Sequence, residues 1–332
     1  MQALALWAFA VAQPLYDVLR RHPEFFIAHR AGLGDLLVFT GLVSFAVPAL
    51  LVSTLLAAVW WRSPWRLTTS AVLCGTLVAA LTSQLLAHRV PLPTTLHALA
   101  ALLGGGAGVW LYYTRQGFRS FLTAMSPAAA IFPLVLLFHP SMATFVKTES
   151  RGDRAAGAIS ADAPPIVFLV FDQLPLTSLM DSRGGIDRDR YPGFAALAGT
   201  STWYRNASTV ADFTGWALPP IVTGLRPAPD RRPTAKSYPH SLFTWLGDRY
   251  HIEGLEPITQ LCPERLCEAR RGTLAGRAAA MMADSSVVYL AIALPEGPRQ
   301  SLPSLTNDWN NFIQDERWQR RWVSESKKDR RR

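Results

Sequence analysis

The first part of the chain is a series of apolar runs separated by short basic loops. Each run is close to the ~20 residues that an α-helix needs to cross a bilayer, which predicts membrane-spanning helices. The clearest runs are residues 36–60, 67–87, 96–113 and 121–138. A fifth run, residues 3–19, contains Pro14 and ends near charged residues, so it either spans the bilayer or lies tilted in its interface. The pattern predicts a multi-pass α-helical membrane region over residues 1–145, with four or five transmembrane helices.

The pattern changes after this region. Residues 146–164 are small, polar and charged, which is typical of a linker. Residues 166–171, Ile-Val-Phe-Leu-Val-Phe, are β-branched, aliphatic or aromatic without interruption, which predicts a buried strand of a parallel sheet. Helical and strand-like patterns then alternate. This alternation predicts an α/β domain with a mostly parallel sheet over residues 165–310, followed by a polar, basic tail over residues 311–332.

Composition narrows the class of protein. The chain has 332 residues, of which 49% are hydrophobic and only 17% charged, and this balance excludes a disordered chain. Three cysteines are too few for a disulfide scaffold and lack zinc-finger spacing. Two of them, Cys262 and Cys267, lie close together in the C-terminal domain and either form a small-loop disulfide or remain free thiols.

The positive charges indicate partners and orientation. Much of the net charge of +9 lies in short loops and in the terminal tail, which favours contact with water or a lipid bilayer over nucleic acid. Arg62 and Arg66 mark one loop and Arg115 and Arg119 another, whereas the loop between them carries only Arg89. Because loops rich in arginine stay in the cytoplasm, we expect a multi-pass protein of the cell membrane with an extracytoplasmic C-terminal domain.

Two polar residues stand at positions where an α/β domain collects ligands. Asp172 directly follows the predicted strand, and ligands gather at the carboxyl ends of parallel strands. It is therefore either a metal ligand or the cap of the next turn. Thr214 begins a predicted helix, where its hydroxyl lies beside backbone N–H groups that attract phosphate or sulfate. Its alternative role is that of an ordinary helix N-cap.

Taken in order, residues 165–175, 201–207 and 214–224 resemble the amino-terminal half of the catalytic domain of a membrane-anchored sulfatase-like protein of the alkaline phosphatase superfamily. In sulfatases the nucleophile begins a helix ten residues before the glycine of a Leu-Thr-Gly ending. Val222-Thr223-Gly224 is similar to that ending, which gives Thr214 the nucleophile's position. The arrangement also resembles lipid-headgroup phosphotransferases, which use threonine.

The resemblance implies a divalent metal ion, calcium, manganese or zinc. Asp172 matches the first aspartate that holds this metal, and Thr214 and Gln173 are the further ligands that the resemblance offers. The metal would lower the pKa of the Thr214 hydroxyl, and the alkoxide would attack the phosphorus or sulfur of an ester.

The sequence departs from the family at several positions. Trp216 and Leu218 replace the proline and arginine of the sulfatase Cys/Ser-x-Pro-x-Arg motif, and formylglycine is not made at a threonine. Members of the family complete the metal site with an Asp-His pair. This chain contains no such pair, so the alkaline phosphatase-like domain is expected to be incomplete. We therefore expect a membrane-bound, truncated or weakly active relative of metal-dependent hydrolases or transferases, with a phosphate or sulfate ester as substrate. The alternative is a catalytically inactive membrane protein whose remnant domain binds a ligand or partner.

Overall fold

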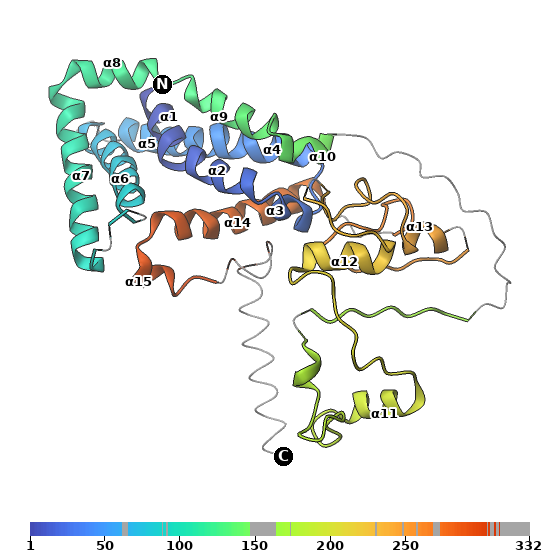
Figure 1. Cartoon of the computed structure of the whole chain (residues 1–332). Helices are drawn as coiled ribbons and strands as arrows, with labels where there is room; N and C mark the ends of the chain where they lie inside the picture. Colours follow the sequence, from blue (N-terminus) through green and yellow to red (C-terminus); the bar gives the residue numbers. More distant parts are fainter. Residues whose placement is uncertain are drawn as a thin grey trace. The chain divides into compact units, whose positions relative to one another are not determined.

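The computed structural model describes residues 1–61, 66–87, 89–90, 92–146, 164–172, 174–229, 231–247, 249–256, 258–267, 273–303, 305, 309 and 312. The chain divides into two units (Figure 1). The first, called the helical unit below, comprises Met1–Glu149, Glu256–Gln260 and Ala269–Arg332. The second, called the loop-rich unit, comprises Ser150–Leu255 and Leu261–Glu268.

The helical unit is built from apolar helices joined by short turns. In chain order its elements are α1 (Gln2–Trp7), η1 (Ala8–Ala12), α2 (Gln13–Arg21), α3 (Glu24–Ala28), α4 (Leu33–Gly41), η2 (Leu42–Ala46), α5 (Val47–Trp61), α6 (Arg66–Ala87), α7 (Thr94–Thr114), α8 (Gln116–Ala124), α9 (Ala128–Leu137), η4 (Pro140–Met142), α10 (Ala143–Val146), α14 (Leu274–Ala293) and α15 (Glu296–Arg299). The backbone stays helical from α1 through η1 to α2 and from α4 into η2.

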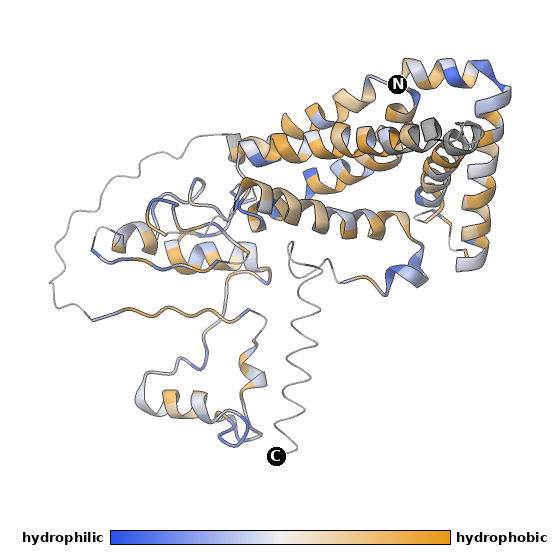
Figure 2. Cartoon of the chain, turned by 180° about the vertical axis from the view of Figure 1, so that it is seen from behind, coloured by the Kyte–Doolittle hydropathy of each residue, from blue (hydrophilic) through white to orange (hydrophobic). Residues whose placement is uncertain are grey.

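Among the described residues of this unit, three helical stretches are long and apolar enough to cross a membrane. They are Leu33–Ser53, Thr94–Thr114 and Gln116–Leu137, and no more than a third of each is buried inside the protein. Figure 2 shows hydrophobic residues along these helices. Such outward-facing apolar surface is favourable in lipid and costly in water, which indicates a membrane protein. The predictions for residues 36–60, 96–113 and 121–138 are confirmed as apolar helices of spanning length.

The other two predicted spans are also helical. The run 67–87 lies within α6, whose apolar described part is the shorter Val72–Ala87. The run 3–19 lies within α1, η1 and α2, and the choice between spanning and interfacial placement stays a prediction.

Helix α14 belongs to the helical unit, although the sequence analysis places residues 274–293 in the α/β domain. It packs against α2, α4 and α6, and its Met281 and Val288 lie in the same core as Phe25 and Phe39. Met281 and Val288 are seven residues apart and share one face of the helix. The apolar face of α14 is thus buried among the N-terminal helices.

The loop-rich unit contains η5 (Leu176–Ser178), α11 (Pro192–Thr200), α12 (Thr214–Thr223) and α13 (Leu242–Leu246). Its small core joins Val222 of α12 to Tyr238 and Leu261. Cys262 and Cys267 form a disulfide, with their Cα atoms 6.0 Å apart, which lies in the usual range. The disulfide is therefore the correct alternative of the two that the sequence left open.

The predicted parallel sheet is not supported in the part of the chain that the structure describes. No strand forms there, and β-type pairing is limited to two isolated bridges. Residues 166–171 run as an unpaired segment (Figure 1), and all six side chains are exposed, Val167 by 79% and Leu169 by 72%. A strand is stable only when neighbouring strands satisfy its backbone and other layers cover its apolar faces. The described residues supply neither of these to residues 166–171.

Candidate functional site

Thr214 is the first residue of α12, and the helix N-cap is Phe213. Phe213 has an extended backbone, and its carbonyl accepts the N–H groups of Trp216 and Ala217, both at 2.9 Å. No side chain caps the helix. The Thr214 hydroxyl therefore does not act as the ordinary N-cap that the sequence analysis offered as an alternative.

The Thr214 hydroxyl instead donates a hydrogen bond to Asp172. Its Oγ1 lies 2.8 Å from Oδ1 of Asp172, a normal distance for a hydroxyl on a carboxylate, although the two residues are 42 positions apart. Asp172 is exposed and Thr214 is half-buried. The structure thus brings together two of the three predicted site residues. Gln173 lies outside the described residues.

Both members of this pair are held by packing of their neighbours. Phe171, next to Asp172, packs edge to face on Phe194 of α11, with ring centroids 5.8 Å apart. On the other side, Val222 anchors α12 in the small core. Gly224 ends α12 with a left-handed backbone, φ 71°, a conformation that favours glycine. The contact between Asp172 and Thr214 therefore depends on both α11 and α12.

The electrostatics of this pair do little to attract an anionic ester. The first turn of α12 attracts an anion by about 0.3–1 kcal/mol, because its N–H groups carry the positive end of the helix dipole. A phosphate about 4 Å from the Asp172 carboxylate would be repelled by about 1 kcal/mol in water. The two effects are of similar size at this exposed position. Helix and carboxylate together give little net attraction for an anion, so an ester needs a further positive charge.

A divalent metal would supply that charge, but the described residues do not complete a site for it. Nowhere among them do three His, Cys, Asp or Glu side chains gather closely enough to hold a metal ion. Asp172 and Thr214 offer two oxygens, whereas zinc takes four ligands and calcium at least six. His240 and His251 are both exposed, and His251 lies 4.0 Å from Glu253. The predicted calcium, manganese or zinc ion stays a prediction.

Two pairs of ionisable residues in the interior of the helical unit escaped the sequence analysis. His29 after α3 lies 3.0 Å from Asp284 of α14, and Asp35 of α4 lies 2.9 Å from Arg277 of α14. The sequence signal was the presence of Arg277 and Asp284 seven residues apart on one face of an otherwise apolar helix. Ionisable residues within apolar helices usually have buried partners.

Comparisons with known proteins show no relative, since no family model, no curated protein and no solved structure matches the chain. The functional argument therefore rests on the residues of this chain.

Proposed function

We propose that the chain is a membrane-bound sulfatase-like protein, related to metal-dependent hydrolases or transferases of phosphate or sulfate esters, in a weakly active form. The observation that carries this proposal is the hydrogen bond from Thr214 to Asp172. The sequence resemblance gives Thr214 the position of the nucleophile and Asp172 that of the first aspartate that holds the metal.

Two further features support the proposal. Helices of membrane-spanning length precede the pair in the sequence, as in the membrane-anchored proteins that the chain resembles. The Cys262–Cys267 disulfide suits a domain on the extracytoplasmic side, because disulfides persist in oxidising compartments. The proposal includes an alkaline phosphatase-like α/β domain with a parallel sheet. The exposed apolar run 166–171 supports this part, since such a run needs cover on both faces.

The proposed reaction uses Thr214 as the acceptor. Its hydroxyl oxygen attacks the phosphorus of a phosphate ester, a bond forms between Oγ1 and phosphorus, and the bond from phosphorus to the alcohol oxygen breaks. The hydroxyl proton passes to the Asp172 carboxylate, and the leaving alkoxide takes a proton from water. Water or an acceptor alcohol then displaces Thr214 from phosphorus. A carboxylate is a weak base for an alcohol, so the first step is slow. The second displacement is proposed to be slower still, so that the phosphoryl group accumulates on Thr214 without rapid turnover.

Covalent labelling tests this reaction. The purified full chain in detergent is incubated with an aryl phosphate and manganese, zinc or calcium, and the peptide that contains Thr214 is analysed by mass spectrometry. We expect a phosphoryl group on Thr214 that is absent in Thr214→Ala and reduced in Asp172→Asn. Thr223→Ala is the matched control, because Thr223 is at the other end of α12 and donates its hydroxyl to Pro219. It should label like the unsubstituted chain.

Steady hydrolysis of aryl phosphates and aryl sulfates should be no faster than in Thr214→Ala. An unlabelled peptide in the unsubstituted chain, or equal labelling of Thr214→Ala, would show that Thr214 is not the acceptor. Metal-dependent turnover that both Thr214→Ala and Asp172→Asn abolish would contradict the weak activity proposed here and require further metal ligands.

The rival function is a catalytically inactive membrane protein whose remnant domain binds a ligand or partner. The small number of metal donors near Asp172 in the described chain favours it. Binding of an aryl phosphate or sulfate that depends on residues of α12, without a covalent adduct, would distinguish this function from the proposed one.

A further inference from the structure

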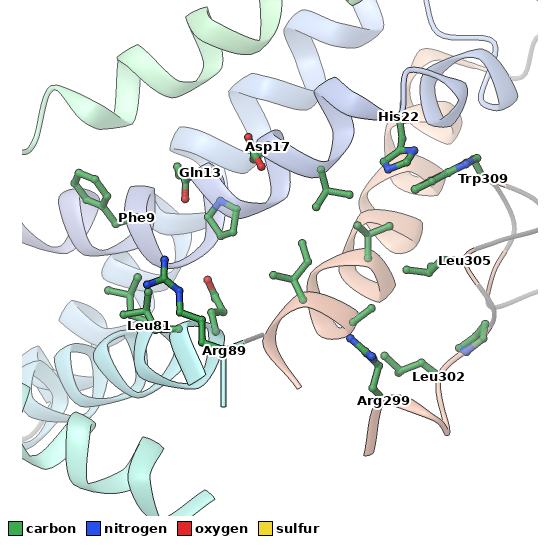
Figure 3. Close-up of a pocket in the computed structure, with 18 of the residues that line it drawn as sticks. Phe9, Gln13, Asp17, His22, Leu81, Arg89, Arg299, Leu302, Leu305 and Trp309 are labelled. Atoms are coloured by element: carbon green, nitrogen blue, oxygen red, sulfur yellow. The ribbon is translucent and has the colours of Figure 1, made fainter. Parts of the chain in front are cut away.

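The helical unit contains a groove of about 970 Å³, called the basic groove below, between α2, α6, α14 and the segment that follows α15 (Figure 3). Its walls are mostly apolar. They include Leu81, Leu85, Val288, Ile292, Leu302 and Leu305. All of the lining residues belong to the helical unit.

One polar side chain that lines this groove, Gln84, is bonded within the protein. The side-chain amide of Gln84 donates to the carbonyl of Ala10 at 2.7 Å and to the hydroxyl of Tyr289 at 3.1 Å. The Tyr289 hydroxyl donates to the same Ala10 carbonyl at 2.9 Å. The Gln84 amide therefore adds little polar contact for a ligand, and the apolar walls supply most of the contact.

The charged groups that line the groove leave an excess of positive charge. Arg89, just beyond α6, and Arg299, the last residue of α15, both line it and have no ion-pair partner in the described chain (Figure 3). Among the described lining residues there is one carboxylate, that of Asp17, and it forms ion pairs with both Arg20 and Arg21. In the described part of the groove, Arg89 and Arg299 are thus the charges available to a ligand.

Two stacked aromatic rings form part of the wall of the basic groove. His22 stacks on Trp309 with ring centroids 4.7 Å apart and ring planes 23° from parallel. Both side chains line the groove (Figure 3). Tryptophan is enriched at membrane–water interfaces, where one part of a ligand is apolar and another is hydrated.

We propose that the basic groove binds an anionic lipid, with its acyl chains against α6 and α14 and its headgroup phosphate held by Arg89 and Arg299. A hydrophilic anion would leave the apolar walls uncovered, and a lipid without net charge would leave the two arginines uncompensated. An anionic lipid satisfies both, and the helices of membrane-spanning length in the same unit give it access. This site is separate from Thr214 and Asp172 and does not rest on the proposed reaction.

Lipid binding to the purified full chain in neutral detergent tests the inference. Native mass spectrometry measures bound phosphatidylglycerol, and phosphatidylcholine with the same acyl chains is measured in parallel. We expect preference for phosphatidylglycerol and an affinity lower by on the order of tenfold in Arg89→Gln/Arg299→Gln, since each arginine near a membrane surface contributes measurably to anionic lipid binding. Arg115→Gln/Arg119→Gln removes the same charge from the start of α8, outside the groove, and should keep the affinity within about twofold.

A second variant tests the apolar walls independently of charge. Ala291 of α14 lines the groove, and Ala291→Trp fills part of it while both arginines remain. Its affinity for phosphatidylglycerol should fall, while its helix content by circular dichroism stays unchanged. Equal affinities in the two double-arginine variants, equal binding of both lipids, or equally tight binding of glycerol phosphate would each overturn the proposal.

Discussion

Loss of one partner from the ion pair between Asp35 and Arg277 should strongly destabilise the helical unit. Asp35 is 3% exposed, and its carboxylate accepts hydrogen bonds from Nε of Arg277 at 2.9 Å and from Nη2 at 3.2 Å. The same carboxylate accepts the backbone N–H of Gly32 at 2.9 Å, which caps the start of α4. One buried side chain therefore joins the beginning of α4 to α14.

Removal of Arg277 leaves this carboxylate buried with less compensation. Loss of one partner from a buried pair typically costs about 3–5 kcal/mol, because a buried charge remains. The Arg277 side chain is 18% exposed, so water reaches the pair and the lower end of this range applies. We expect Arg277→Met to lower the free energy of unfolding by about 3 kcal/mol. Asp35→Asn removes the charge and keeps an acceptor for Gly32, so it should partly rescue Arg277→Met.

The measurement is unfolding in mixed micelles as the fraction of sodium dodecyl sulfate rises, followed by circular dichroism. The double variant should show a coupling energy of about 1–3 kcal/mol between the two positions. Arg119→Met, on α8, is the control and should change stability by less than about 0.5 kcal/mol. Additive single effects, or an Arg277→Met variant as stable as the control, would refute the argument that this buried pair holds α14 in place.

Three other features give simpler tests. In the same micelle assay, His29→Ala should lower the free energy of unfolding by about 3 kcal/mol, because the buried carboxylate of Asp284 loses its imidazole partner. A decrease of less than about 1 kcal/mol would contradict this. Replacement of both Cys262 and Cys267 by serine should cost the loop-rich unit about 2 kcal/mol, measured by limited proteolysis, and equal protease resistance would show that the bridge is dispensable. Alkaline phosphatase fused after Ser160 should be active and a fluorescent protein at that site dark; the reverse result would place the C-terminal domain in the cytoplasm.

The helical unit shows how far an apolar pattern alone predicts structure. Residues 96–113 and 121–138 contain long apolar runs with few charges, and such runs have one stable outcome in a membrane, a spanning helix. Helix α14 was missed because Arg277 and Asp284 interrupt its apolar pattern. Their partners are more than 240 residues away in the sequence, so no local pattern reveals that these charges are compensated.

The candidate site was predictable for a different reason. The sequence predicted one site from two features, the spacing of residues around Thr214 and the position of Asp172 at the end of an apolar run. The structure places the two side chains in contact. The metal ligands were not predictable in the same way. A metal site needs side chains from several distant segments, and the sequence around Asp172 and Thr214 supplies only their immediate neighbours.

The segment 166–171 connects the fold to the candidate site. Its pattern is that of a buried strand, but pairing is a property of two segments, and the described residues provide no neighbouring strand. Burial of a large apolar side chain stabilises a protein by about 1.5–3 kcal/mol, so six exposed ones forgo on the order of 10 kcal/mol, as much as the whole stability of a typical domain. Asp172 directly follows this segment. Whatever covers the segment therefore also fixes the carboxylate that accepts the Thr214 hydroxyl.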